Sequence, residues 1–280
     1  MPRFSASQFW KQALDSKATT VNLIEAACNI LKLRPRSEFY PGHTIRCAYG
    51  VRNNAHDVFL NEFKIPYFVS GYGMTEIPGV TCSPYGAIQK PGTMGPIGKH
   101  PNPHQPWAEC RVVDDEGRDV PDGQTGEMIV RTPIIMQGYF RDAAQTQASF
   151  RDGWFLTGDL VSRDRDGYYT FVSRKKDIIR RRGENIAGAE LDRIIGNHSD
   201  VAEVATIAVP AELGEDEILA AIVLKKHATA NAHDIQAWCA QHLAPMKVPR
   251  YIAFLEELPY TPTQKISKAI LRADSSLISK

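Results

Sequence analysis

The chain has 280 residues, of which 43% are hydrophobic and 23% are charged, and its formal net charge is +1. This is the composition of a globular protein with one large domain or two moderate ones. A net charge of +1 gives no electrostatic argument for a highly charged partner, and no nucleic-acid partner is expected.

A transmembrane segment or a signal peptide in the sequence would bear on the cellular location. No apolar run reaches the roughly 18 residues that a transmembrane helix needs, and the N-terminal stretch MPRFSASQFW has neither an apolar signal region nor a small-residue cleavage site. We therefore expect a cytoplasmic protein without a transmembrane segment. The cysteines are odd in number, far apart and without metal-ligand spacing, which predicts buried reduced thiols at Cys28, Cys47, Cys82, Cys110 and Cys239.

Helices are expected in the first forty residues. A cap at residues 5–7 precedes apolar residues at helical spacing, namely Phe9, Trp10, Ala13 and Leu14. A second helix over 21–33 places on one face Leu23, Ile24, Ala27, Ile30 and Leu31. Packing into a core is the expected role of both.

The next segment alternates between strand and helix signals and ends in a glycine-rich hexapeptide. Strands are predicted over 44–49 and 67–69, with a helix over 55–63 between them. Residues 71–76 then read GYGMTE. The glycines would let backbone approach a flat ligand, and Thr75 and Glu76 offer a hydroxyl and a carboxylate for phosphate and a divalent cation. A turn that simply ends a strand explains the hexapeptide equally well.

Residues 86–150 predict loops and a small β-structure. The stretch 86–106 is rich in glycine, proline and histidine, and its histidines lack carboxylate or thiol partners at metal-ligand spacing, so they are interpreted as surface residues. Strands over 109–113 and 126–130 with intervening turns predict a meander, and 143–150 is helical.

The stretch 153–186 reads GWFLTGDLVSRDRDGYYTFVSRKKDIIRRRGENI. A short buried strand at 154–156 would deliver the carboxylate of Asp159 to a tight turn, where it could bind a pair of hydroxyls. A hairpin follows, with its turn at 164–167 and a strand at 168–172. Six basic residues then lie between 174 and 182, either as a solvated surface or as an anion-binding junction between two folded units.

The remaining hundred or so residues predict a compact α+β unit. Helices are expected over 188–198 and 232–243, and strands over 201–209, 218–224 and 251–255.

Taken together, GWFLTGD, the Arg-x-Lys-Asp step at 174–177 and RGENI at 182–186 are similar to the core motifs of the adenylate-forming acyl-CoA synthetases, the AMP-dependent synthetase and ligase family. RRGENI followed by Ala187-Gly188 most resembles the carnitine/crotonobetaine-type ligases, and 258–268 resembles the family's closing motif with Gln264 where glycine is usual. The resemblance covers the C-terminal portion of the family, which implies that the chain is truncated before Met1.

The fold that this resemblance implies is α/β plus α+β. Residues 1–173 would form the C-terminal part of the large AMP-binding domain, with a parallel sheet and a small β-barrel. Residues 174–280 would form a mobile α+β lid. In the family the two parts rotate about the Arg-x-Lys/Asp step, so Lys176 is the expected hinge.

The resemblance also implies roles for the first hexapeptide and for the ribose. Tyr72, next to Gly73, would stack on adenine, Thr75 would contact phosphate and Glu76 would hold magnesium. Asp159 and Arg174 would bind the ribose hydroxyls. These roles are carried over from the matching family motifs.

In the second part of the chain, the resemblance makes Lys265 the catalytic lysine that offsets charge at the reacting phosphate. Lys268 is the competing candidate, and Lys265 is preferred because Ile266 follows it as in the family. For the thioester step, rotation of the lid would bring to the site Gly183, Glu184 and Asn185.

The function implied is that of an ATP-dependent acid–CoA ligase that uses Mg²⁺, with ATP, CoA and a small carboxylic acid as its partners. A non-catalytic remnant and a peptide-synthetase adenylation domain remain as alternatives. Arg52 stands where the family has a small-residue turn, and it would either bind the nucleotide or alter the adenine pocket.

One family element is missing from this sequence, a Ser-, Thr- and Gly-rich phosphate loop that ends in Lys. We therefore expect slow adenylation by this chain alone, and self-association through apolar helix faces that have lost their cover.

Overall fold

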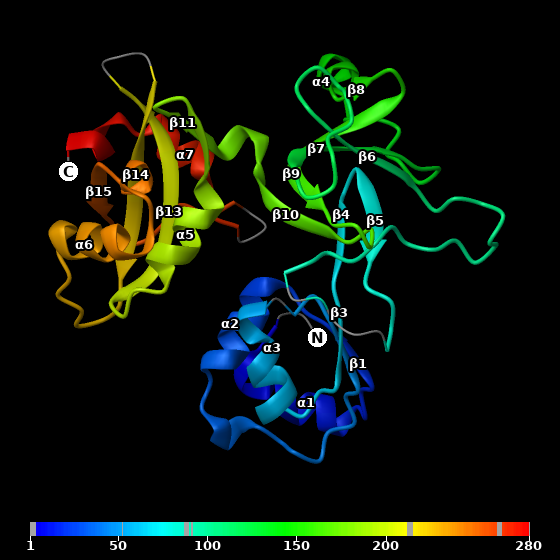
Figure 1. Ribbon diagram of the computed structural model, residues 1–280. Helices are drawn as coiled ribbons and strands as arrows, with labels where there is room; N and C mark the ends of the chain where they lie inside the picture. The colour runs from blue at the N-terminus through cyan, green and yellow to red at the C-terminus, as the bar shows by residue number, and fades with distance from the viewer. Residues whose placement is uncertain are drawn as a thin grey trace. The chain divides into compact units, whose positions relative to one another are not determined.

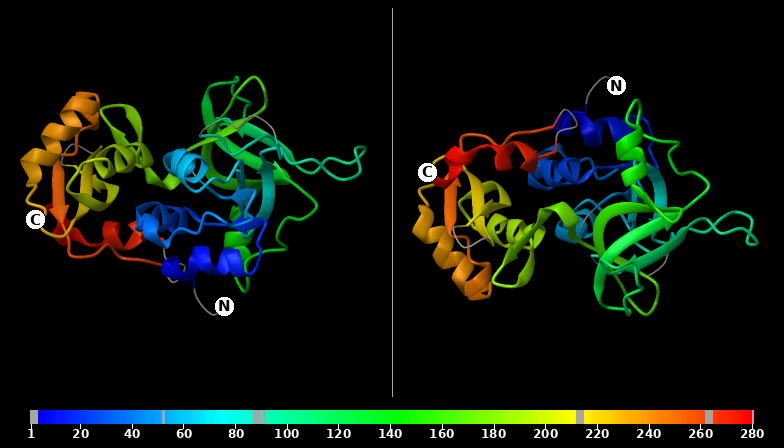
Figure 2. Two further views of the ribbon diagram at one scale, coloured as in Figure 1. Left: turned by 90° about the horizontal axis from the view of Figure 1, so that it is seen from below. Right: turned by 90° about the horizontal axis from the view of Figure 1, so that it is seen from above.

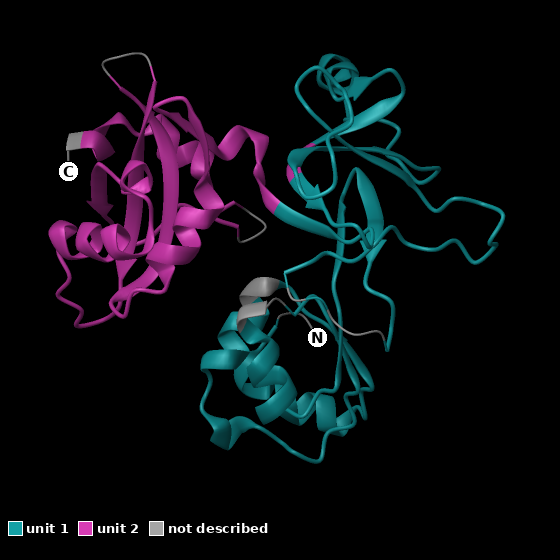
Figure 3. Ribbon diagram, in the orientation of Figure 1, with its two compact units in different colours: residues 1–157, 161–171 teal, residues 158–160, 172–280 magenta. Residues whose placement is uncertain are grey.

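A computed structural model describes residues 4–51, 53–86, 90, 92–211, 215–261 and 265–279. The expectations for Arg52 and Gln264 therefore lie outside the described residues. The chain divides into two compact units (Figure 3): residues 1–157 with 161–171 form unit 1, and residues 158–160 with 172–280 form unit 2. The division of 1–173 from 174–280 as domains stays a prediction.

Unit 1 begins with a small α/β arrangement in which helices and a short sheet share one core (Figure 1). Three short strands, β1 (Thr20–Asn22), β2 (Cys47–Tyr49) and β3 (Tyr67–Val69), pair in parallel in the order β1-β2-β3. Parallel strands need crossover connections. These are supplied by α2 (Glu25–Leu33) and by α3 (Asn53–Asp57), which continues as a π-helical turn over Val58–Glu62. Before them lie a 3₁₀ turn at Ala6–Gln8 and α1 (Phe9–Asp15), and a further 3₁₀ turn follows at Arg36–Glu38.

The core of this part confirms the predicted helix over Phe9 to Leu14, since Trp10 and Ala13 of α1 are buried. The helix predicted over 21–33 is wrong at its start, because Val21 lies in β1 and α2 begins at Glu25. Ile24 and Ile30, predicted on the buried face, are 68% and 45% exposed. Ile24 precedes the helix in extended conformation, and the buried face of α2 is formed by Ala27, Cys28 and Leu31, with Ile30 to one side of it.

The rest of unit 1 is built from antiparallel strands. β4 (Gly71–Met74) and β5 (Ile77–Cys82) form a hairpin. A five-stranded sheet follows the order β10-β9-β7-β6 with β8 paired to β9. Its strands are β6 (Glu109–Val113), β7 (Thr125–Arg131), β8 (Phe150–Arg151), β9 (Trp154–Arg163) and β10 (Tyr169–Arg174), and α4 (Ala143–Ala148) precedes β8. Residues 158–160 of β9 and 172–174 of β10 are grouped with unit 2.

The meander predicted over 109–113 and 126–130 is confirmed by β6 and β7. The small closed barrel that the family resemblance implied is not found among the described strands. The sheet is an open path that ends at β6 and β10, and its apolar side packs on the β4–β5 hairpin through Ile77, Val80 and Met128. Packing against a second layer buries this face without closing the sheet.

Unit 2 is a three-stranded sheet covered by helices on both faces (Figure 2). β13 (Val201–Pro210) and β14 (Asp216–Leu224) are antiparallel, and β15 (Tyr251–Phe254) runs parallel to β14. Ile218, Ala220 and Ile222 of β14 pack with α5 (Gly188–Gly196) and α6 (Ala232–His242), whereas Leu219 and Ala221 pack with α7 (Lys268–Ala273). This two-residue alternation is what a strand buried on both faces produces.

The remaining elements of unit 2 are a small hairpin and three 3₁₀ turns. The hairpin is formed by β11 (Ile178–Arg181) and β12 (Glu184–Ala187), and the turns lie at Lys175–Asp177, Pro245–Lys247 and Ser275–Ser279. The helices and strands predicted for this part of the chain are confirmed to within a few residues at each end.

The five cysteines all lie in described parts of the chain and form no disulfide, as predicted. Cys28, Cys47 and Cys239 are buried, but Cys82 is exposed and Cys110 is half-buried, so the prediction of uniform burial is wrong. Within the described ranges, no helix is long and apolar enough to span a membrane.

Candidate functional site

The glycine-rich hexapeptide forms the end of a hairpin. Gly71–Met74 is strand β4, and only Thr75 and Glu76 make the turn into β5. Tyr72 is 9% exposed and belongs to the core of the antiparallel layers, whereas Thr75 is exposed and Glu76 is half-buried. The two groups predicted to contact phosphate and a cation thus lie side by side at the accessible tip of a rigid hairpin.

The structure gives the two glycines a reason that the sequence did not suggest. A Cβ on Gly73 would lie 2.4 Å from the backbone nitrogen of Gly79, and one on Gly71 would lie 2.8 Å from the carbonyl oxygen of Thr81. Both contacts are too short for a real side chain, so the glycines let β4 and β5 approach each other. Ligand approach is therefore not needed to explain them, and cofactor binding by Gly73 stays a prediction.

Glu76 is held by a segment far away in the sequence. The Tyr139 hydroxyl donates a hydrogen bond to Glu76 Oε1 at 2.9 Å, and the Met136 N–H donates to the Glu76 backbone carbonyl at 2.7 Å. No group of three or more Asp, Glu, His or Cys side chains that could hold a metal ion occurs in the described parts of the chain. A cation at Glu76 would therefore take most of its ligands from another molecule.

Asp159 does not lie in a turn at the end of a strand, as predicted, but inside the ten-residue strand β9. Gly158, with φ +67°, lets the strand bend there without ending. Along β9 the buried residues alternate, and they include Phe155, Thr157 and Asp159. The carboxylate of Asp159, 1% exposed, is consequently on the inward side of the strand.

A buried carboxylate needs a partner, and Arg174 supplies one. Arg174 Nε lies 2.6 Å from Asp159 Oδ1, and the arginine side chain is 42% exposed. Arg174 ends β10, the strand next to β9 in the sheet. The structure thus brings together the two residues that the sequence assigned to one ribose.

The basic run forms the β11–β12 hairpin. Arg181 pairs with Glu184, and the two residues between them, Arg182 and Gly183, both have positive φ, +52° and +78°. Positive φ at both positions is the signature of a type I′ turn, which matches the twist of the strands. Of the three residues expected to act in the thioester step, Gly183 lies in this turn, and Glu184 and Asn185 belong to β12.

Three consecutive acidic residues meet the three consecutive arginines of this hairpin. The Arg180 N–H donates to Asp216 Oδ2 at 2.9 Å, and the Arg182 N–H donates to Glu215 Oε2. Arg181 Nη2 lies 2.8 Å from Glu217 Oε2, with both side chains largely buried. The anions that the basic run was expected to attract are thus found, at least in part, within the chain.

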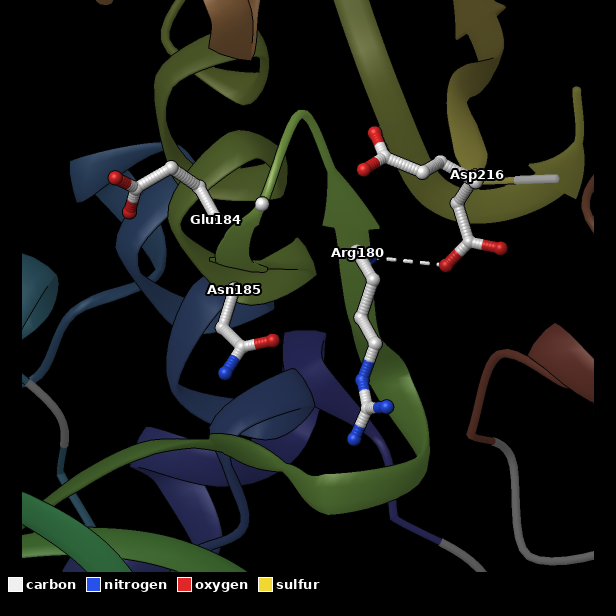
Figure 4. Close-up of a pocket in the computed structure, with 6 residues that line it drawn as sticks. Arg180, Glu184, Asn185 and Asp216 are labelled. Carbon is white, nitrogen blue, oxygen red and sulfur yellow. Dashed lines mark hydrogen bonds between the residues drawn. The ribbon is translucent and has the colours of Figure 1, made fainter. Parts of the chain in front are cut away.

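A pocket of about 460 Å³ opens beside this hairpin (Figure 4). It is lined by Arg180, Gly183, Glu184, Asn185, Glu215 and Asp216. Arg180 and Asn185 are register partners, so their side chains extend to the same side of the hairpin, while Glu184 extends to the other. The pocket therefore offers a ligand one cationic group and one amide, together with the carboxylates of Glu184, Glu215 and Asp216.

The two candidate lysines near the C-terminus differ in their surroundings. Lys268 Nζ lies 2.6 Å from Asp192 Oδ2, and the other oxygen of that carboxylate accepts the Thr206 N–H and hydroxyl at 2.6 and 2.7 Å. Lys265 is exposed; its backbone carbonyl accepts the Thr261 N–H at 2.7 Å, and its own N–H donates to the Thr261 hydroxyl oxygen at 3.2 Å. Lys268 thus has a structural partner, and Lys265 presents its ammonium to solvent.

Lys176, the predicted hinge, lies in the 3₁₀ turn that links β10 to β11, and its side chain is exposed. The next residue, Asp177, is ion-paired with Arg272 of α7. The hinge role itself stays a prediction.

Sequence reasoning missed Tyr139 and the acidic triplet 215–217. Tyr139 gave no local signal, because its partner is 63 residues away. The triplet did give one, since Glu-Asp-Glu complements Arg-Arg-Arg in sign and length, and charge patterning could have suggested their pairing.

Two family models match different parts of the chain. The family model described as AMP-binding enzyme matches residues 1–140, and that described as AMP-binding enzyme C-terminal domain matches residues 190–265. Relatives include the sulfoacetate–CoA ligase of Cupriavidus necator, 31% identical over 95% of this chain, and the crotonobetaine/carnitine–CoA ligase of Proteus mirabilis, 30% identical over 97%. The chain spans about half the length of the curated relatives it matches, 52% of each of these two.

Solved structures agree with this assignment. ATP-bound MatB from Rhodopseudomonas palustris superposes with a TM-score of 0.84 at 26% identity, over 98% of this chain and 54% of that one. O-succinylbenzoate coenzyme A synthetase from Bacillus subtilis, in complex with AMP, gives a TM-score of 0.79 at 25% identity, over 98% of this chain and 54% of that one. The chain therefore belongs to the family of AMP-binding enzymes.

Proposed function

We propose that this chain serves in ATP-dependent ligation of a carboxylic acid to coenzyme A. In the first step the acid's carboxylate oxygen attacks the α-phosphorus of ATP, and the bond to the leaving pyrophosphate breaks. In the second step the CoA sulfur attacks the acyl carbon, AMP leaves and the thiol proton passes to solvent or base. As part of this proposal we assign the activity to the cytoplasm. Self-association stays a prediction.

The observation that carries the proposal is the ion pair between Asp159 and Arg174 at 2.6 Å. A buried carboxylate fixed by a guanidinium is a preorganised acceptor for hydroxyl donors, because its rotamer is already set. We assign the ribose hydroxyls to this pair. We assign adenine to Tyr72 with Gly73, and a phosphate oxygen to the exposed hydroxyl of Thr75.

For magnesium we assign Glu76. The carboxylate is the hard oxygen ligand that Mg²⁺ prefers, and Mg²⁺ commonly binds through one or two carboxylates together with substrate phosphates. A single half-buried carboxylate beside a hydroxyl at a hairpin tip fits that pattern. When bound, the ion would neutralise phosphate charge.

For the other roles we assign Lys265 to charge neutralisation at the reacting phosphate, since its ammonium is exposed while that of Lys268 is paired. We assign the thioester step to the hairpin residues Gly183, Glu184 and Asn185, which line the pocket in Figure 4. Lys176 is the proposed pivot between the two steps.

The test is AMP binding by the chain and by Asp159→Asn, measured by calorimetry. Asparagine keeps the shape but removes the charge, so two charge-assisted hydrogen bonds to ribose weaken. We expect a loss of about 3 kcal/mol, roughly a hundredfold in Kd. ATP–pyrophosphate exchange with a panel of carboxylic acids should fall in parallel.

The matched control is Asp119→Asn, because Asp119 also pairs with an arginine Nε, that of Arg111 at 2.8 Å, but on the surface of another strand. This control should bind AMP as the unmodified chain does. Equal affinity of Asp159→Asn and Asp119→Asn would make Asp159 a structural residue and remove the main support for the proposal.

A further inference from the structure

The hydrogen bond between Tyr139 and Glu76 joins a loop to the hairpin tip that carries the proposed magnesium ligand. Tyr139 donates its hydroxyl proton to Glu76 Oε1 at 2.9 Å. The same loop also fixes the Glu76 backbone through the Met136 N–H, at 2.7 Å from the Glu76 carbonyl oxygen. Both the position and the side-chain orientation of Glu76 are thereby determined by residues 136–139.

The backbone of Tyr139 is itself held by hydrogen bonds to the start of α4. Its N–H donates to the Thr146 hydroxyl oxygen at 2.9 Å, and that hydroxyl donates to the backbone carbonyl of Asp142 at 2.8 Å. Asp142 caps α4 by accepting the Gln145 N–H at 2.9 Å. The backbone of Tyr139 is therefore anchored to a capped helix, which fixes the point from which its side chain reaches Glu76.

The phenol of Tyr139 is chemically suited to position Glu76, the proposed metal ligand. A tyrosine hydroxyl is uncharged and donates one hydrogen bond, here to Glu76 Oε1 at 2.9 Å. A neutral donor orients the carboxylate without cancelling its charge, whereas a lysine or arginine at the same place would compete with a cation.

We propose that Tyr139 is a positioning residue for the divalent cation of the bound nucleotide: it holds Oε1 of Glu76 and leaves Oε2 to the metal. This inference rests on the proposed role of Glu76. No other described residue makes a hydrogen bond or ion pair with the Glu76 side chain. Groups of this kind, which hold a ligand in its binding orientation, commonly raise metal affinity by tenfold or more.

The test compares ATP binding in the presence of Mg²⁺ and in the presence of a chelator, by calorimetry, for the chain and for Tyr139→Phe. The substitution removes one oxygen atom and nothing else. We expect the metal-free affinity to be unchanged and the strengthening by Mg²⁺ to fall roughly tenfold. Raising the Mg²⁺ concentration should restore binding to Tyr139→Phe, because the ligand itself is still present.

Two variants make the outcomes distinct. Tyr67→Phe makes the same chemical change at an exposed tyrosine and should leave the Mg²⁺ effect intact. Glu76→Gln should abolish the effect at every Mg²⁺ concentration. An unmodified chain without a Mg²⁺ effect, or a Glu76→Gln variant that keeps it, would overturn both the role of Glu76 and this inference. A Tyr139→Phe variant that keeps the full Mg²⁺ effect while Glu76→Gln loses it would overturn this inference alone. The same holds if Tyr139→Phe melts at a lower temperature but keeps the full Mg²⁺ effect, because Tyr139 would then be a structural residue.

Discussion

Arg181 should be the most costly arginine to remove from unit 2. Its guanidinium is buried, with the residue 7% exposed, and it makes three contacts at once. Nη2 lies 2.8 Å from Glu217 Oε2, and Nη1 donates to the backbone carbonyls of Met246 and Val248 at 2.7 and 3.0 Å. Arg181→Met would leave a carboxylate and two carbonyls without these donors.

The size of the expected destabilisation depends on which cations still pair with Glu217 in Arg181→Met. Of the described residues, Arg250 is the other cation within ion-pair distance of Glu217, at 3.7 Å, and its side chain is 57% exposed, so it compensates little. Removing one partner of a buried ion pair costs about 3–5 kcal/mol, mostly because the other charge stays buried. Arg181→Met should therefore lower the free energy of unfolding of unit 2 by about 4 kcal/mol.

The double variant Arg181→Met/Glu217→Leu should recover about half of this loss, because it removes the uncompensated charge but not the loss of the two carbonyl partners. Hydrogen exchange of the β14 amides in increasing urea measures unit 2 by itself. Arg250→Met is the control and should cost less than about 1 kcal/mol, as exposed pairs do. A single variant within about 1 kcal/mol of the parent, or a double variant as unstable as the single, would refute this reasoning.

Two further predictions concern unit 1. Burial lowers the pKa of His56 below its ordinary 6.5, so the unfolded chain binds the proton more tightly than the folded chain does. The contribution of His56 to stability is complete above pH 6.5 and falls as the pH drops toward the folded-state pKa. Thermal unfolding across this pH range should therefore show a smaller loss of stability for His56→Gln than for the unmodified chain. Gly95 and Gly167 share a φ of +81°, but a Cβ would lie 2.4 Å from a backbone nitrogen at Gly95 and would meet nothing within 4 Å at Gly167. Gly167→Ala should cost about 1–2 kcal/mol from backbone strain and Gly95→Ala clearly more, and equal melting temperatures for the two variants would contradict the steric explanation.

The fold of unit 2 could be predicted from the sequence because its signals are local. β13 and β14 are apolar runs of strand length, and the capping box of α6, with Asn231 and Asp234, marks a helix start. The boundaries of the elements in unit 1 were harder to predict. In α2 the apolar positions continue upstream into β1, so periodicity alone could not show where the helix begins.

Asp159 illustrates why a correct residue can be predicted with the wrong geometry. Thr157-Gly158-Asp159 reads as a turn, because glycine with polar neighbours usually ends a strand. In β9 the glycine takes positive φ while pairing continues, so the aspartate stays on the buried side. The sequence predicts the hairpin strand at 168–172, but not that β9 continues through Gly158 to pair with it, which places Arg174 at the end of β10 beside Asp159.

The last prediction concerns the basic run 174–182, whose charge is plain in the sequence but whose acidic partners lie more than thirty residues further along the chain. Glu215 and Asp216 accept the N–H groups of Arg182 and Arg180 and line the same pocket as the Arg180 side chain. Their carboxylates should mask the arginines from outside polyanions. In Glu215→Gln/Asp216→Asn the amide oxygens still accept both hydrogen bonds, so the hairpin should persist while the masking is lost.

The expected result is tighter binding to heparin, measured as the salt concentration needed for elution. The control Asp114→Asn/Glu116→Gln removes two negative charges as well, from a chain of net charge +1, at a turn where both acids pair with the exposed Arg118. Because the two double variants carry the same net charge, any difference between them reports where the charge lies. Elution of both double variants at the same salt concentration would mean that the triplet does not mask the arginines.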